Sequence, residues 1–267
     1  VQKVSQKTET IPQIGIVFSK ESLYATSNKL FGGWGKASDP ARGWLDLVLG
    51  CGFSADILPD WKLEKVVSRY PFVILPDWAA PGEAVKKALL EYVSAGGKLL
   101  VAGAKNAALF AAEAGVRLVG EPAVQEAFLP GEVMGNAKGL WQDVEATTAR
   151  VLASRFPTLD SRKDGKAAAV AQAVGKGEMV LVPGPIGVVY AATHASVIRG
   201  FAGQLIAPRF RPLVRLSEPP TVEVVLRRKE GQVLVHLLNS TNMQVAGNFA
   251  TTDFVPAVGP VRLGLGK

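Results

Sequence analysis

The sequence is poor in the residues that most often carry redox, metal or nucleophilic chemistry. Its 267 residues include one cysteine, Cys51, and two histidines, His194 and His236. A single cysteine excludes an intrachain disulfide and a zinc site built from cysteines. Two histidines exclude a metal centre made of several imidazoles. We therefore expect no metal site in this chain. The glycine-rich segments at 32–35 and 184–187 do not fit a phosphate-binding motif, so we expect no cofactor either.

The sequence also lacks an uninterrupted apolar run of about 18 residues, the length that a membrane-spanning helix needs. The nearest approach, residues 179–189, contains two prolines and two glycines. We therefore expect a soluble protein without membrane contact. The chain begins with Val1, and no basic-then-apolar signal pattern follows. This start indicates a processed chain or part of a longer one, and the sequence leaves the compartment open between cytoplasm and export.

Charged residues are few, and basic residues outnumber acidic ones. Charged residues make up 20% of the chain, and 30 basic against 23 acidic residues leave a net charge of +7. The basic residues are densest at 209–215 and 227–229. Neither segment is interleaved with aromatic residues, so we expect no nucleic-acid partner. Both segments are typical of solvated surface, and the alternative is a contact with an acidic partner surface or another domain.

Apolar residues, at 48% of the chain, are abundant enough for a large core. Short apolar runs alternate with helical patterns in the first half of the chain. Expected strands are 14–18, 55–58, 72–75, 98–102 and 116–119, and expected helices are 39–50, 60–70, 81–95 and 106–115. This alternation predicts an α/β fold, with a flavodoxin-like, doubly wound and mostly parallel sheet.

The pattern changes in the second half. Residues 167–174 and 177–182 predict a hairpin, and 195–205 predict a helix. After several prolines, strict alternation over 222–228 and 232–238 indicates a short antiparallel β unit. We therefore predict two domains, 12–215 and 216–267. The polar residues 1–11 are expected to form a mobile lead-in.

Several segments together resemble one known family. They are Leu58-Pro59, residues 70–76, 90–100 and 175–184, and the β-type segments 222–228 and 235–239. The chain resembles the middle, or trimerisation, domain of bacterial beta-galactosidases and related glycoside hydrolases, which has a class I glutamine amidotransferase-like fold. The later segments resemble the opening of the β-sandwich that follows this domain.

The resemblance implies a module of a multidomain glycoside hydrolase-like protein. In such proteins the sugar-cleaving carboxylates lie on a preceding barrel. The middle domain supplies subunit contacts and lends residues to the rim of a neighbour's active site. The expected partners are therefore further copies of the chain, other domains of the parent protein, and carbohydrate.

Amide transfer requires a cysteine on the sharp turn after a central strand. Here that turn spans residues 101–106, and Lys105 stands about where the nucleophile belongs. Cys51 lies instead near an expected helix C-terminus, where the helix dipole disfavours a thiolate. His194 follows a late strand, as the amidotransferase histidine does, but without the cysteine we expect it to serve in packing or hydrogen bonding.

Other candidate residues follow the expected strands. Asp77 lies where open α/β sheets bind ligands, although a loop or capping role is the common alternative. No second acid is clearly paired with it, as glycoside hydrolysis requires. Trp34, Trp61 and Trp78 lie in loops or after strands, where tryptophan stacks on sugars or fills a partner's pocket. The alternative is that each covers the sheet edge.

Three hypotheses follow. The chain is a non-catalytic assembly module that borders a carbohydrate site, with Trp34, Trp61 or Trp78 at the contact. Alternatively, it is a degenerate hydrolase in which Asp77, Lys105 and His194 converge in one pocket. The third hypothesis is a sugar-binding module without assembly.

Overall fold

The computed structural model describes residues 2–26, 37–78, 81–160, 162–218, 221–240, 244–246, 249–251 and 256–266. Its centre is a seven-stranded sheet in the order β10-β11-β12-β5-β4-β2-β3. Five neighbouring strands are parallel: β12 (Gly177–Val182), β5 (Lys98–Ala102), β4 (Phe72–Leu75), β2 (Ile14–Phe18) and β3 (Ala55–Pro59). Two antiparallel strands, β11 (Lys166–Val174) and β10 (Arg150–Arg155), extend the sheet on the β12 side.

The five parallel strands follow the order 2-1-3-4-5 when they are renumbered along the chain. This is the strand order of flavodoxin-like folds. The predicted α/β class with a mostly parallel sheet is therefore confirmed, as are the strands expected at 14–18, 55–58, 72–75 and 98–102. The hairpin expected at 167–182 is also present, as β11 and β12.

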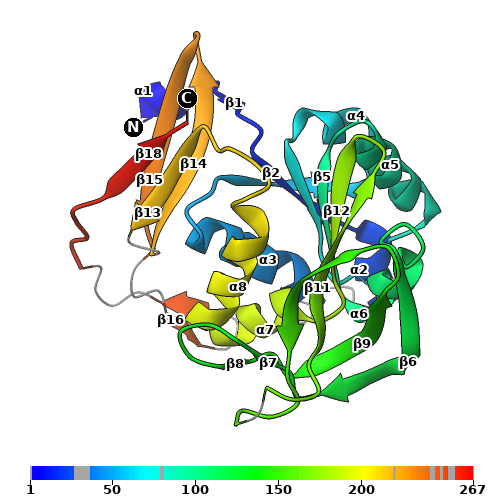
Figure 1. The fold of residues 1–267 in the computed structure, drawn as a ribbon. Coiled ribbons are helices and arrows are strands. Elements are labelled where there is room, and N and C mark those ends of the chain that lie inside the picture. The colour runs from blue at the N-terminus through cyan, green and yellow to red at the C-terminus, as the bar shows by residue number, and fades with distance from the viewer. Residues whose placement is uncertain are drawn as a thin grey trace.

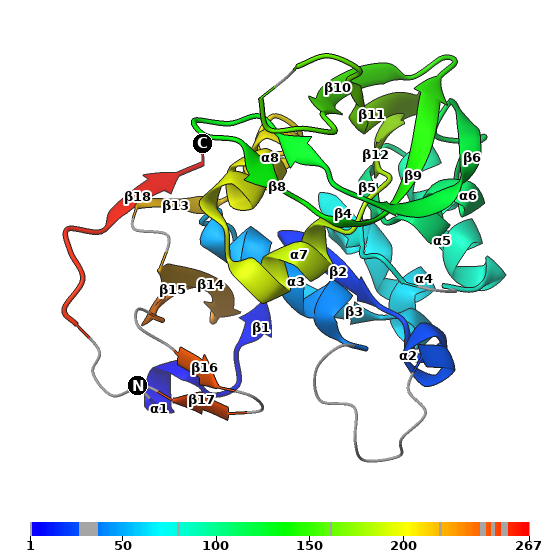
Figure 2. The ribbon, with the colours of Figure 1, turned by 90° about the horizontal axis from the view of Figure 1, so that it is seen from below.

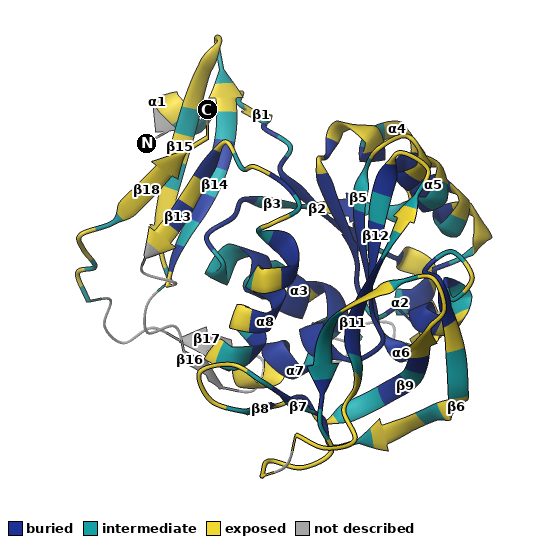
Figure 3. Ribbon diagram, in the orientation of Figure 1, coloured by how far each residue is buried: buried dark blue, intermediate teal, exposed yellow. Residues whose placement is uncertain are grey.

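Helices cover both faces of the sheet (Figures 1 and 2). One face packs against α3 (Asp39–Gly50), α7 (Ile186–Thr193) and α8 (Ser196–Ile206). The other packs against α4 (Leu63–Val66), α5 (Glu83–Ser94) and α6 (Ala104–Leu109). Successive strand residues alternate between the two cores, so Leu100 faces α3 and α8 whereas Leu99 and Val101 face α5. Figure 3 shows the resulting band of buried strands.

Glycine allows a close contact between two helices. Gly43 of α3 lies against the backbone of Gly187 in α7, and a Cβ at Gly43 would stand 1.8 Å from the Gly187 carbonyl oxygen. The α3 helix begins with Pro40 in its first turn and ends before Gly52, whose φ is +79°. Its position is therefore set at both ends and along one face.

Three expectations about elements were wrong. Residues 116–119 belong to β6 (Val116–Gln125), which pairs antiparallel with β9 (Gly139–Ala146) outside the main sheet. The fifth parallel strand is instead β12. Residues 60–70 form α4 between two 3₁₀ turns, η1 (Asp60–Lys62) and η2 (Val67–Arg69), rather than one helix. The lead-in contains α1 (Gln2–Ser5) and β1 (Glu9–Thr10), and β1 is fixed by pairing with β14.

The last part of the chain forms the predicted antiparallel strands. β14 (Val222–Lys229) lies between β1 and β15 (Gln232–Asn239), and β13 (Val214–Glu218) pairs with β18 (Arg262–Leu265). Val214, Leu216, Val222, Val224 and Leu226 form a small third core with Ile11. The remaining short elements are α2 (Lys20–Thr26), β7 (Phe128–Leu129), β8 (Gly135–Asn136), β16 (Gln244–Ala246) and β17 (Phe249–Thr251). Among the helices described, none is both long and apolar enough to cross a membrane.

Candidate functional site

Asp77 and Lys105 are brought together at the carboxyl edge of the sheet. β4 and β5 are parallel neighbours, so the turns that follow them lie side by side. Asp77 follows β4, and Gly103 begins the turn after β5 with a φ of +100°. A Cβ at Gly103 would stand 1.9 Å from Asp77 Oδ1. Only glycine therefore lets this carboxyl group rest against the turn, and Lys105 follows in the first turn of α6.

Burial controls the ionisation of Asp77. Removal from water raises the pKa of its carboxyl group to about 6, although the Lys105 ammonium acts in the opposite direction. The group therefore carries a proton at mildly acidic pH and loses it near neutrality. A carboxyl group with this pKa can exchange protons near neutral pH.

Two buried side chains hold this edge in place. The Asn106 side-chain amide donates to the carbonyls of Pro76, at 2.7 Å, and Ala102, at 2.8 Å, and so ties β4 to β5. Trp78 is 2% exposed, and its indole donates to the Val17 carbonyl at 2.8 Å. This burial corrects the expectation that Trp78 contacts a partner or a sugar, because its ring is already used in packing.

Trp61 is exposed at the same edge. It lies in η1 after β3, and 57% of its surface is exposed. The Lys20 ammonium stands 5.8 Å from the centre of its ring. The Lys20 backbone amide donates to Asp60 Oδ2 at 2.7 Å, which joins the turns after β2 and β3. Trp61 thus offers a flat apolar surface flanked by polar groups. Trp34, the third tryptophan of the prediction, lies outside the described residues.

His194 lies apart from Asp77 and Lys105. It follows α7, an eight-residue helix that the sequence analysis missed, and so does not directly follow a strand. Its Nε2 is 3.7 Å from Asp46 Oδ2 of α3, and its ring packs 5.2 Å from the Tyr190 ring. Among the described residues, Lys105 is the only charged group whose charge shifts the pKa of the Asp77 carboxyl group. The predicted convergence of Asp77, Lys105 and His194 is therefore wrong.

The chemistry available at this edge is limited. Glycoside hydrolysis uses two carboxyl groups on either side of one bond, whereas the described turn after β5 presents an ammonium to Asp77. Cys51 is at the end of α3, and burial raises the pKa of its thiol to about 11. It is thus a thiol at neutral pH, as expected. Within the described ranges, no three His, Cys, Asp or Glu side chains gather as a metal site would require.

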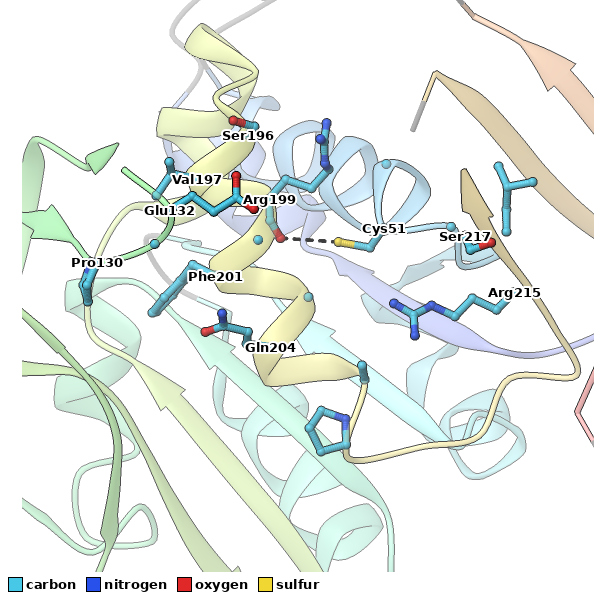
Figure 4. Close-up of a pocket in the computed structure, with 18 of the residues that line it drawn as sticks. Cys51, Pro130, Glu132, Ser196, Val197, Arg199, Phe201, Gln204, Arg215 and Ser217 are labelled. Carbon is cyan, nitrogen blue, oxygen red and sulfur yellow. Dashed lines mark hydrogen bonds between the residues drawn. The ribbon is translucent and has the colours of Figure 1, made fainter. Parts of the chain in front are cut away.

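A second feature was not predicted. A groove of about 770 Å³ lies beside α8, between the end of α3, the loop 130–133 and β13 (Figure 4). Arg199 and Arg215 line it, together with Cys51 and Glu132. The basic segment 209–215 was a partial signal for this groove. Its other walls come from distant parts of the sequence, and no single motif joins them.

Comparisons with known proteins identify the architecture. No protein-family model matches the sequence, and no curated protein sequence matches it. Solved structures of glycoside hydrolases contain a similar fold. Alpha-L-fucosidase isoenzyme 2 from Paenibacillus thiaminolyticus matches with a TM-score of 0.74 at 15% identity, over 99% of this chain and 43% of that one.

Two further matches are also parts of larger chains. A catalytic mutant of Gan42B, a GH42 beta-galactosidase from G. stearothermophilus, matches with a TM-score of 0.65 at 16% identity, over 88% of this chain and 35% of that one. Exo-beta-1,4-mannosidase Op5Man5 from Opitutaceae bacterium strain TAV5 matches with a TM-score of 0.54 at 16% identity, over 76% of this chain and 37% of that one. The chain thus spans less than half the length of these structures, and such identities show the fold alone.

Proposed function

We propose that this chain is a non-catalytic α/β module of a glycoside hydrolase-like protein, which mediates subunit or domain assembly and borders a carbohydrate site. The main support for the proposal is the share of each chain that the structural match covers. Nearly the whole chain, 99%, corresponds to 43% of a fucosidase. This coverage supports a chain that corresponds to one part of a larger protein, whose sugar-cleaving carboxylates, as the resemblance implies, lie on another domain.

The turn after β5 supports a non-catalytic role. In the resembling amidotransferase fold this turn holds the reactive thiol, whereas here Lys105 occupies it. Cys51 is remote from it in the fold, at the end of α3. The turn begins with Gly103 at a positive φ, and it lacks the nucleophile that amide transfer requires.

Trp61 is the contact residue that the structure supports best. A tryptophan with 57% of its surface exposed, beside a lysine, is an effective anchor at an interface. We expect Trp61→Ala to weaken self-association by about tenfold or more. Light scattering on size-exclusion chromatography measures this loss. Val124→Ala is the control, since Val124 is also exposed but lies on β6. Equal behaviour of the two variants would contradict an interface at Trp61.

A sugar-binding module is the second candidate, and Trp61 favours it as well. Its ring is accessible for stacking, and Asp60 lies beside it in the sequence. Titration calorimetry with galactose and fucose distinguishes the two functions. Binding by the monomer that disappears in Trp61→Ala supports a sugar-binding module. Association without sugar binding supports the assembly role.

A further inference from the structure

The groove beside α8 runs along the backbone of this helix. Its floor includes Gly200 and Gly203 of α8. A Cβ at Gly200 would meet nothing within 4 Å, and one at Gly203 would meet only the Cys51 sulfur at 3.4 Å. The helix backbone is therefore accessible from the groove at these two glycines, which lie a little less than one turn apart. The residues that line the groove run from Ser196 to Pro208, which leaves room for an extended polypeptide.

Two arginines from different elements face this space (Figure 4). Arg215 of β13 packs its guanidinium 4.9 Å from the Phe53 ring centre. The Arg199 side chain, on α8, donates a hydrogen bond to the Tyr190 hydroxyl. Among the ion pairs of the described residues, none involves either arginine. Both guanidiniums are thus positioned by aromatic neighbours and keep their capacity to bind carboxylates.

The basic character continues along α8. A neighbouring cavity of about 290 Å³ shares Phe201, Gln204 and Pro208 with the groove, and Arg150 lines it. Arg209 and Glu178 also line this cavity but pair with each other at 3.0 Å. Glu132, in the loop 130–133, is the acid that lines the main groove. Apart from the Arg209–Glu178 pair, the combined surface therefore carries three arginines, Arg150, Arg199 and Arg215, and one acid, Glu132.

We propose that this groove binds an acidic polypeptide segment of a neighbouring domain or subunit, with Arg199 and Arg215 holding its carboxylates. The choice of a polypeptide over a small anion rests on the proposed assembly role and on the length of the combined surface. Charge complementarity selects the acidic partner.

Cys51 supplies a built-in reporter, because it is the only cysteine in the sequence and lines the groove. The experiment measures the rate of Cys51 alkylation by iodoacetamide at pH 8.5, with and without acetylated hexaglutamate. Hexalysine at the same concentration is the peptide control, and glutarate at the same carboxylate concentration represents a small anion. We expect hexaglutamate alone to slow alkylation.

Variants assign the effect to the groove. Arg199→Gln and Arg215→Gln should each weaken the protection by about tenfold, because each removes a charged hydrogen-bond donor. Gly200→Trp should abolish the protection by filling the groove, independently of charge. Arg211→Gln should retain it, since Arg211 is exposed but does not line the groove.

Three results would overturn the proposal. They are an unchanged alkylation rate with hexaglutamate, equal protection by glutarate, and equal loss of protection in Arg211→Gln. The second result assigns the groove to small anions, and the third indicates diffuse attraction to a chain of net charge +7. Self-association is measured separately, so a chain that associates but leaves Cys51 unprotected refutes the groove while the assembly role stands.

Discussion

At the scale of single residues, Asp77 couples stability to pH. The pKa of its carboxyl group is raised from 3.8 to about 6 in the folded chain. Between these two values the folded state binds more protons than the unfolded state, so stability falls as the pH rises from about 4 to 6. The corresponding free energy is at most about 3 kcal/mol, at about 1.4 kcal/mol per pKa unit.

Replacement of Asp77 by asparagine should remove this fall. We expect Asp77→Asn to raise the free energy of unfolding relative to the wild-type chain at pH 7, and to change it little at pH 4, where the carboxyl group is protonated. Urea denaturation at both pH values measures the difference. Glu91→Gln is the control, because Glu91 is exposed on α5. An equal change at both pH values would show that the burial of a charged Asp77 is not the cause.

At the scale of elements, the packing of α3 on α7 depends on Gly43. A methyl group there would stand 1.8 Å from the Gly187 carbonyl oxygen, so the two helices must separate. We expect Gly43→Ala to lower the free energy of unfolding by about 2 kcal/mol. Gly200→Ala is the matched control on α8, where a Cβ meets nothing within 4 Å and alanine favours the helix by about 0.5–1 kcal/mol. Thermal unfolding should therefore shift in opposite directions for the two variants.

The elements also show where sequence patterns are informative. Runs such as Phe72–Leu75 predict buried parallel strands well, because both faces of such a strand are covered. The run at 116–119 is also mostly apolar, but its partner β9 lies outside the main sheet, and no local pattern reveals a partner. The α7 helix was missed because its residues are almost all apolar and show no amphipathic period.

The same limits apply to the candidate site. Asp77 and Lys105 follow neighbouring parallel strands, so sequence reasoning could place them at one edge of the sheet. It could not place His194, because α7 displaces this residue from the strand end. It also could not predict the groove, whose walls come from four separate segments that only the fold brings together.

At the scale of the whole molecule, the chain has the architecture of one part of larger glycoside hydrolases. Strands β13 and β14 share a small core with Ile11 near the start of the chain. Both described ends of the chain lie on the same side of the α/β layer (Figure 1). The carboxyl edge with Trp61 and the groove beside α8 remain available for contacts with other chains or domains.

Sedimentation equilibrium of the full chain over a wide concentration range tests the assembly role most directly. We expect the mass to rise above that of the 28.2 kDa monomer, to the mass of a closed oligomer, as the concentration increases. A mass that stays at the monomer value throughout, together with cleavage of galactosides or fucosides by the chain alone, would contradict it.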